Sequence, residues 1–93
     1  MNQMPERRLR ETLQQLHEEL DRTESIGTED RALLKDLMED IQHTLEKPEE
    51  GTAERHQSLN DRLRQTAGDF EEAHPSLTLA LRRVIDAFRW MSV

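Results

Sequence analysis

Two histidine–carboxylate pairs have the spacing of metal ligands on one side of a helix. Asp40 precedes His43 by three residues, and Glu71 precedes His74 by three residues. Dinuclear metal bundles use two such pairs together with two further glutamates that point inward. Here His43 is expected to face away from the apolar side of its segment, His74 adjoins Pro75, and no further inward carboxylate is evident. We therefore predict no metal site, and a metal- or ligand-binding four-helix bundle remains the alternative.

The residue types of a catalytic triad occur at Ser58, His56 and Asp61. They would lie on one short helix and point in different directions, with no glycine-rich elbow to form an oxyanion hole. The chain has no cysteine and only three isolated glycines, which excludes thiol chemistry and phosphate-binding loops. We therefore predict that the protein is not an enzyme and that it binds no cofactor.

The composition favours a single helical domain over residues 1–93. Hydrophobic residues make up 33% of the chain, charged residues 35% and aromatic residues 3%, a poor mixture for a sheet core. The 20 acidic and 13 basic residues give a net charge of -7, which repels phosphate backbones, so we expect no nucleic-acid binding. No apolar run is long enough for a signal peptide or a membrane span, so we expect a cytoplasmic protein without integral membrane association.

Apolar residues recur at spacings of three and four, which predicts an all-α fold. We expect four helices and one linker, over about residues 5–23, 29–46, 47–52 (the linker), 53–74 and 75–91. Gly27 can end the first helix in the left-handed conformation, and Thr28 can cap the second. Pro48 ends the second helix, because a residue before proline is disfavoured in helical geometry.

The last two segments form either two helices or one helix kinked at Pro75. Their heptad pattern continues in phase from Phe70 through Ala73 to Leu77, which favours a single helix. A proline costs about 3 kcal/mol inside a helix but little in its first turn. We therefore prefer a break near His74 and two antiparallel αα-hairpins, packed as a bundle or in a coiled-coil-like arrangement. The four segments either close into a bundle within one chain or swap between two chains to form a dimeric bundle.

The third segment has the weakest apolar stripe, because His56 and Thr66 interrupt a seam of only three large apolar residues. Such polar residues can fix the register of a coiled coil, and a buried histidine can make assembly sensitive to pH. We favour the simpler interpretation, that this stretch faces solvent and is loosely packed. With so little apolar material in the chain, we expect a homodimer.

The fourth segment has apolar residues on two sides. Leu79 and Trp90 are eleven residues apart, about three turns, and lie opposite the stripe that includes Phe88, with Arg83 beside them. This second side is a predicted partner contact, because tryptophan and arginine are enriched at interfaces. The alternative is a tryptophan that lies on the surface or folds back near the chain end. The complete set of interface candidates is Leu79, Arg83, Trp90, Phe88, Met91, His56, Leu59, Leu63 and Phe70.

These observations favour a non-enzymatic module that associates with itself, or with an unidentified protein partner, through amphipathic helices. A peripheral membrane protein that binds through the three arginines of the fourth segment is a further alternative.

Two stretches also carry a resemblance to a known family: LHEELDRTES at residues 16–25 and FEEAHPSL at residues 70–77. The sequence resembles the bacterial domain of unknown function 4404 family, although it ends in Ser92-Val93 where some members end in Gly-Ile. The resemblance implies a small bacterial helical protein with no assigned activity, so no functional residue is transferred.

Overall fold

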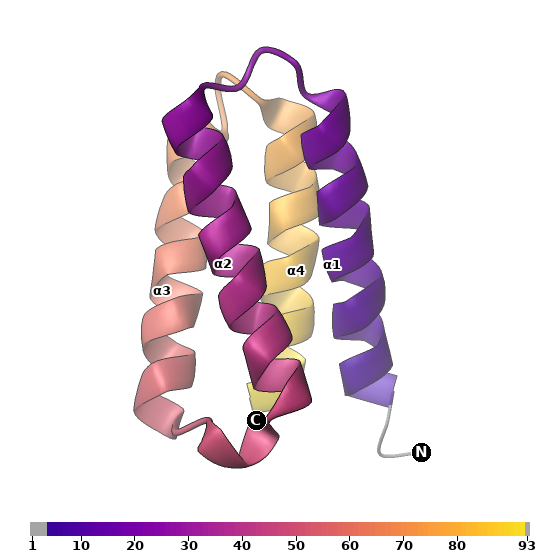
Figure 1. Ribbon diagram of the computed structural model, residues 1–93, viewed down its shortest axis with the longest axis vertical. Helices are drawn as coiled ribbons and strands as arrows, with labels where there is room; N and C mark the ends of the chain where they lie inside the picture. The colour runs from indigo at the N-terminus through magenta and orange to yellow at the C-terminus, as the bar shows by residue number, and fades with distance from the viewer. Residues whose placement is uncertain (1–3, 93) are drawn as a thin grey trace.

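A computed structural model describes residues 4–92 of the chain, and the side chains of residues 6–47 and 49–90. Its elements, in chain order, are α1 (Met4–Arg22), α2 (Thr28–Glu46), the short 3-10 helix η1 (Pro48–Glu50), α3 (Ala53–Phe70) and α4 (Pro75–Ser92) (Figure 1). No strand occurs among residues 4–92. The predicted all-α fold of four helical segments is therefore confirmed.

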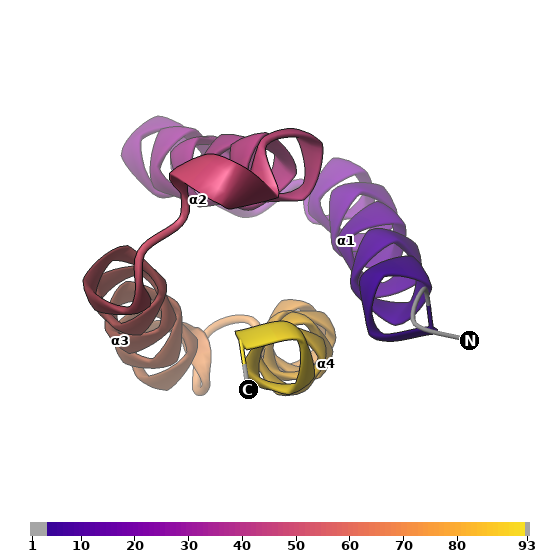
Figure 2. The same ribbon diagram turned by 90° about the horizontal axis from the view of Figure 1, so that it is seen from below.

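The four long helices form an up-down-up-down bundle. Consecutive helices run in opposite directions, and α4 returns to the side of α1, which closes the ring (Figures 1 and 2). Viewed along the bundle, α4 lies on the side opposite α2 (Figure 2). This arrangement leaves each helix with one inner face and one outer face, so the outer residues of every helix are available to solvent or to a partner.

The helices are not equally close to one another. The backbones of α1 and α4 approach each other most closely, followed by those of α3 and α4, while α2 stands farther from both of its neighbours. The buried face of α4 includes Ala80 and Ala87, and small side chains permit such close approach. The wider space beside α2 is filled by leucine, isoleucine and methionine side chains.

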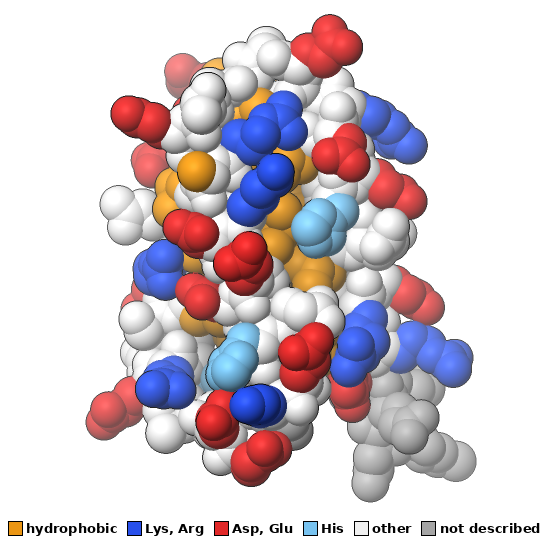
Figure 3. Space-filling model, viewed as in Figure 1, with side chains coloured by type: hydrophobic (Ala, Val, Ile, Leu, Met, Phe, Trp, Pro, Cys, Tyr) orange, Lys and Arg blue, Asp and Glu red, His pale blue; other side chains and the backbone are white. Residues whose placement is uncertain are grey.

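One apolar core runs through the bundle. Its members are Leu9, Leu13, Leu16, Leu20, Ile26, Leu34, Leu37, Met38, Ile41, Leu45, Leu59, Leu63, Ala67, Phe70, Leu77, Ala80, Leu81, Val84, Ile85, Ala87 and Phe88. Charged side chains of both signs cover the face seen in Figure 3, and apolar side chains show in a strip between α1 and α2. A single chain therefore buries a core that includes residues from every long helix.

The prediction that a left-handed Gly27 ends the first helix is wrong. Gly27 is not left-handed, because its φ is −69° and its ψ is 157°. It holds the N-cap position of α2 without a side-chain cap hydrogen bond, so the prediction that Thr28 caps this helix is also wrong, and Thr28 is its first residue. Arg31, and not a left-handed glycine, provides hydrogen bonds to carbonyl oxygens near the end of α1. Its guanidinium donates to the carbonyl oxygens of Leu20 at 3.3 Å and Thr23 at 2.9 Å, just past the end of α1. The Leu20 oxygen also accepts from the backbone N–H of Thr23 at 3.2 Å.

The prediction of two helices at Pro75 is confirmed. Pro75 is the first residue of α4, where its missing N–H group removes no helical hydrogen bond. The backbone N–H of His74 donates to the carbonyl oxygen of Phe70 at 2.8 Å, which closes the turn between the two helices.

At the other end of α3, the hydroxyl oxygen of Thr52 accepts a hydrogen bond from the backbone N–H of Arg55 at 3.1 Å.

The expectation that the third segment is loosely packed and faces solvent is wrong. Thr66 is buried at 5% exposure, and its hydroxyl donates to the carbonyl oxygen of Arg62 at 2.8 Å. The ring of His56 stands edge-on to Phe88, with centroids 5.5 Å apart. The apolar members of the seam are also buried: Leu59, Leu63 and Phe70. The wide apolar face of α4 covers this weak stripe. The spacing of apolar residues within α3 could not indicate that another helix would bury them.

Candidate interaction surface

The outer face of α4 carries the two most exposed large apolar side chains among those described. Leu79 is 54% exposed and Trp90 is 67% exposed, whereas Leu33 on α2 is 38% exposed. The opposite side of α4 is buried in the core, with Phe88 fully covered. The predicted position of Leu79 and Trp90 on the solvent side of the helix is therefore confirmed.

Two charged residues lie between Leu79 and Trp90 on the same side of the helix. Arg83 and Asp86 are both exposed, and neither forms a hydrogen bond or ion pair with another side chain that the structure describes. The neighbouring Arg82, in contrast, contacts the Glu71 carboxylate at 3.2 Å. We call Leu79, Arg83, Asp86 and Trp90 the α4 strip. Its spacings of four, three and four keep the members within about 60° of one another around the helix.

The other predicted interface residues lie elsewhere. Four of them are buried within the single chain and line its core: Leu59, Leu63, Phe70 and Phe88. His56 is half-buried between α3 and α4, and the side chain of Met91 lies outside the described residues. The accessible part of the predicted set is therefore Leu79, Arg83 and Trp90. Sequence reasoning missed Asp86, although its spacing from Arg83 and Trp90 was available as a signal.

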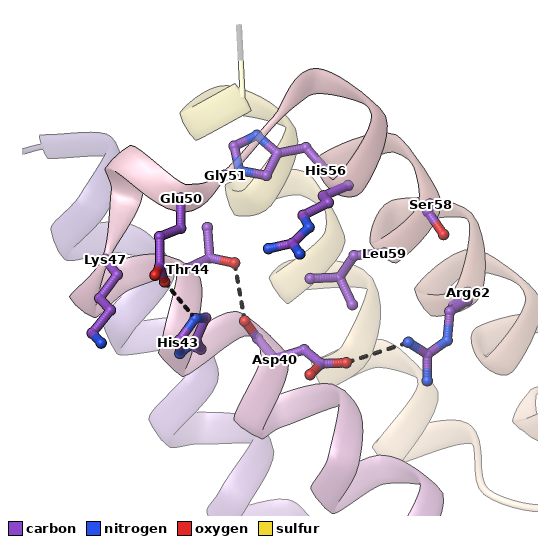
Figure 4. A pocket seen from close by; sticks show the side chains of 11 residues that line it. Asp40, His43, Thr44, Lys47, Glu50, Gly51, His56, Ser58, Leu59 and Arg62 are labelled. Carbon is purple, nitrogen blue, oxygen red and sulfur yellow. Dashed lines mark hydrogen bonds and ion pairs between the residues drawn. The ribbon is translucent and has the colours of Figure 1, made fainter.

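A polar hollow of about 270 Å³ lies where α2, η1 and α3 meet (Figure 4). Its two carboxylates already have partners across the hollow. Glu50 Oε2 lies 3.0 Å from His43 Nε2, and Asp40 Oδ2 lies 3.3 Å from Arg62 Nη1. These contacts join η1 to α2 and α3 to α2 through side chains that are about half exposed.

His56 lines this hollow from α3 and is held tightly against the backbone. A Cβ atom added at Gly51 would lie 2.5 Å from His56 Nε2, so only glycine leaves room for the ring there. His56 Nε2 and Asn60 Oδ1 are buried without a hydrogen-bond partner in the part of the chain that the structure describes. Both residues also line a second hollow of about 210 Å³, beside Phe88 and Arg89.

The chemical constellations considered from the sequence are not assembled. Asp40 and His43 engage different partners, as described above, and Glu71 contacts Arg82 while His74 stands against Phe70. Among the side chains of residues 6–47 and 49–90, no three histidine or carboxylate groups gather in a way that could hold a metal ion.

Ser58, His56 and Asp61 do not form a hydrogen-bonded triad. Ser58 and Asp61 are exposed on α3, and His56 Nε2 makes no hydrogen bond to either. No helix within residues 4–92 is long and apolar enough to cross a membrane. The surface that stands out is therefore the α4 strip, and not a reactive cluster.

A small up-down-up-down four-helix bundle with an outer apolar and charged strip is the class of protein that these features define. The chain belongs to the family described as a domain of unknown function, DUF4404, whose family model matches residues 9–93. The resemblance inferred from the two sequence stretches is thereby confirmed. Comparisons with curated proteins and with solved structures gave no match.

Proposed function

We propose that this protein is a non-enzymatic self-association module that forms a homodimer through the α4 strip. The observation that carries the proposal is the exposure of Trp90 and Leu79, at 67% and 54%, on one side of one helix. Tryptophan and arginine are the side chains most enriched among interface residues that dominate binding energy. The strip offers Trp90 at one end and Arg83 near its centre, and Leu79 at the other end adds exposed apolar surface.

The charge distribution supports association through this helix. The whole chain carries a net charge of -7, so two copies repel each other over most of their surfaces. Residues 76–93 contain three arginines and one aspartate, and are therefore the stretch where two copies meet with the least acidic repulsion. Because the long-range repulsion is screened by salt, moderate salt should strengthen the dimer at this face.

The size of the strip sets the expected affinity. Stable interfaces bury about 800 Å² on each partner, and a strip on one helix over three turns offers less than that. We therefore expect a dimer that dissociates in the micromolar range. Its formation should depend on protein concentration, so a measurement at one dilute concentration would record a monomer.

The test is sedimentation velocity over protein concentrations from about 1 to about 500 μM, spanning the expected micromolar dissociation constant. The unmodified chain should shift from monomer to dimer, and the Leu79→Ala/Trp90→Ala variant should remain a monomer throughout. Leu33→Ala is the matched control, because Leu33 is an exposed leucine on α2. It should dimerise as the unmodified chain does. A chain that stays monomeric over the whole range, or a double variant that dimerises normally, would reject the proposed function.

A further inference from the structure

The order of residues in the α4 strip specifies how two copies meet. Resting on the proposed function, we propose that α4 pairs with α4 of a second copy in antiparallel orientation, about a two-fold axis at the middle of the strip. Leu79 then lies opposite Trp90 of the second copy, and Arg83 lies opposite Asp86 of the second copy. The same contacts recur on the other side of the axis, because a two-fold interface uses one surface twice.

The strip has the same chemical pattern when it is followed from either end. From its N-terminal end it presents an apolar residue, a charge, a charge and an apolar residue, at spacings of four, three and four. Reversing the direction exchanges Leu79 with Trp90 and Arg83 with Asp86, and leaves the spacings unchanged. The strip is therefore complementary to itself in the antiparallel orientation, both in position and in charge.

A parallel pairing of the same strip lacks this complementarity. It would place Arg83 against Arg83 and Asp86 against Asp86, and like charges in contact oppose association. Antiparallel pairing instead gives each of the four charges an opposite partner. In the single chain, Arg83 and Asp86 have no ion pair with any other side chain among residues 6–47 and 49–90, so no existing contact has to be broken.

The geometry of the helix permits the pairing. The strip runs about 16 Å along α4, at about 1.5 Å per residue, and its members face one direction. The charged residues are at its centre and the apolar residues are at its ends, so Leu79 and Trp90 shield the central ion pairs from water. Shielded pairs set orientation and register strongly, because a mismatched register leaves a charge desolvated without a partner. The α4 helix lies on the side of the bundle opposite α2, so α2 does not obstruct a second copy (Figure 2).

Charge reversal tests the orientation directly. Arg83→Asp places two acids opposite each other at both symmetric contacts, and Asp86→Arg does the same with two cations. Each single variant should raise the dissociation constant of the dimer about tenfold or more, because each contact occurs twice. The Arg83→Asp/Asp86→Arg double variant restores opposite charges across the axis, and its dissociation constant should return to within about threefold of the unmodified value.

Two further measurements complete the experiment. An equimolar mixture of the two single variants should form heterodimers more tightly than either variant forms homodimers, because opposite charges again face each other. Arg64→Asp is the matched control for charge, since Arg64 is exposed on α3 and has no ion pair with a side chain that the structure describes. It should leave the dissociation constant within about threefold. Circular dichroism of every variant should show unchanged helix content, because all of these positions are exposed.

The outcomes separate the pairing from the proposed function. If single reversals have no effect, or if the double variant fails to recover while Leu79→Ala/Trp90→Ala still abolishes the dimer, the antiparallel pairing is rejected and self-association stands. If the unmodified chain is monomeric at every concentration, both are rejected. Recovery in the double variant and in the mixture, with an unaffected Arg64→Asp control, supports both.

Discussion

The polar hollow between α2 and α3 and the strip on α4 differ in how far their charged groups are satisfied within the chain. The hollow holds more ionisable residues, including two histidines, yet its carboxylates face Arg62 and His43. The α4 strip holds only Arg83 and Asp86, beside two exposed apolar side chains. We therefore base the proposed interaction surface on the α4 strip and not on the region with the most ionisable groups. What distinguishes the α4 strip is that charged groups without an ion pair among the described residues lie beside two exposed large apolar side chains.

Substitutions in these two regions should affect different properties of the protein. Changes at the corner of α2, η1 and α3 should alter the stability of the chain and leave its dissociation constant unchanged. Changes in the α4 strip should alter the dissociation constant of the dimer and leave the stability of the chain unchanged. The substitutions below test the difference in order of decreasing effect on the free energy of unfolding.

The largest effect is expected where the two faces of α4 are compared directly. Phe88→Ala removes a ring that is fully buried, and should lower the free energy of unfolding by about 3–5 kcal/mol. Trp90→Ala, two residues away, should change it by less than about 0.5 kcal/mol in the monomer, because the ring is exposed. Urea denaturation at low micromolar concentration measures both. Equal costs for the two substitutions would contradict the assignment of Trp90 to the outer face.

Gly51→Ala should be the most damaging of the corner substitutions. The added Cβ would lie 2.5 Å from His56 Nε2 and force the ring away from its place against Phe88, at a cost of about 1–2 kcal/mol. In a His56→Ala background the same change should cost almost nothing, because the obstructing ring is gone. A cost that is equal in both backgrounds would show that the backbone of Gly51, and not its contact with His56, sets the requirement for glycine.

Thr52→Ala should cost about 1 kcal/mol, because the first turn of α3 loses its side-chain cap. Thr52→Ser keeps the hydroxyl oxygen that accepts from the Arg55 N–H group, and should retain most of the stability. Thermal unfolding followed by circular dichroism compares the two variants. If serine is as damaging as alanine, the hydroxyl does not act as the cap.

The smallest effect is expected at the ion pair that joins α2 to α3. The Asp40 and Arg62 side chains are 53% and 50% exposed, so water competes for both charges. A double-mutant cycle with Asp40→Ala and Arg62→Ala should give a coupling of less than about 0.5 kcal/mol, which falls further at high salt. A coupling above about 2 kcal/mol would show that the hollow is far drier than its exposure indicates.

Much of the fold and part of the candidate interaction surface could be predicted from the sequence. Pro75 marked the start of the last helix, because proline is tolerated only in a first turn. The eleven-residue spacing of Leu79 and Trp90 placed both on the outer side of that helix. The end of α1 was harder to predict, because the Arg31 guanidinium, eleven residues beyond Leu20, donates to the Leu20 carbonyl oxygen. No local pattern near Gly27 contains that contact.

The sequence by itself determined where the helices lie and which side of each is apolar, because both depend on spacings of three and four residues and on the prolines between them. Only the tertiary structure decided which apolar residues are covered by another helix of the same chain. The weak stripe of α3 is buried because α4 packs over it. Arg83 and Asp86 lie on the exposed side of α4 and form no ion pair with another side chain among residues 6–47 and 49–90. Burial and pairing depend on neighbours that are distant in sequence, so periodicity along one helix cannot specify them.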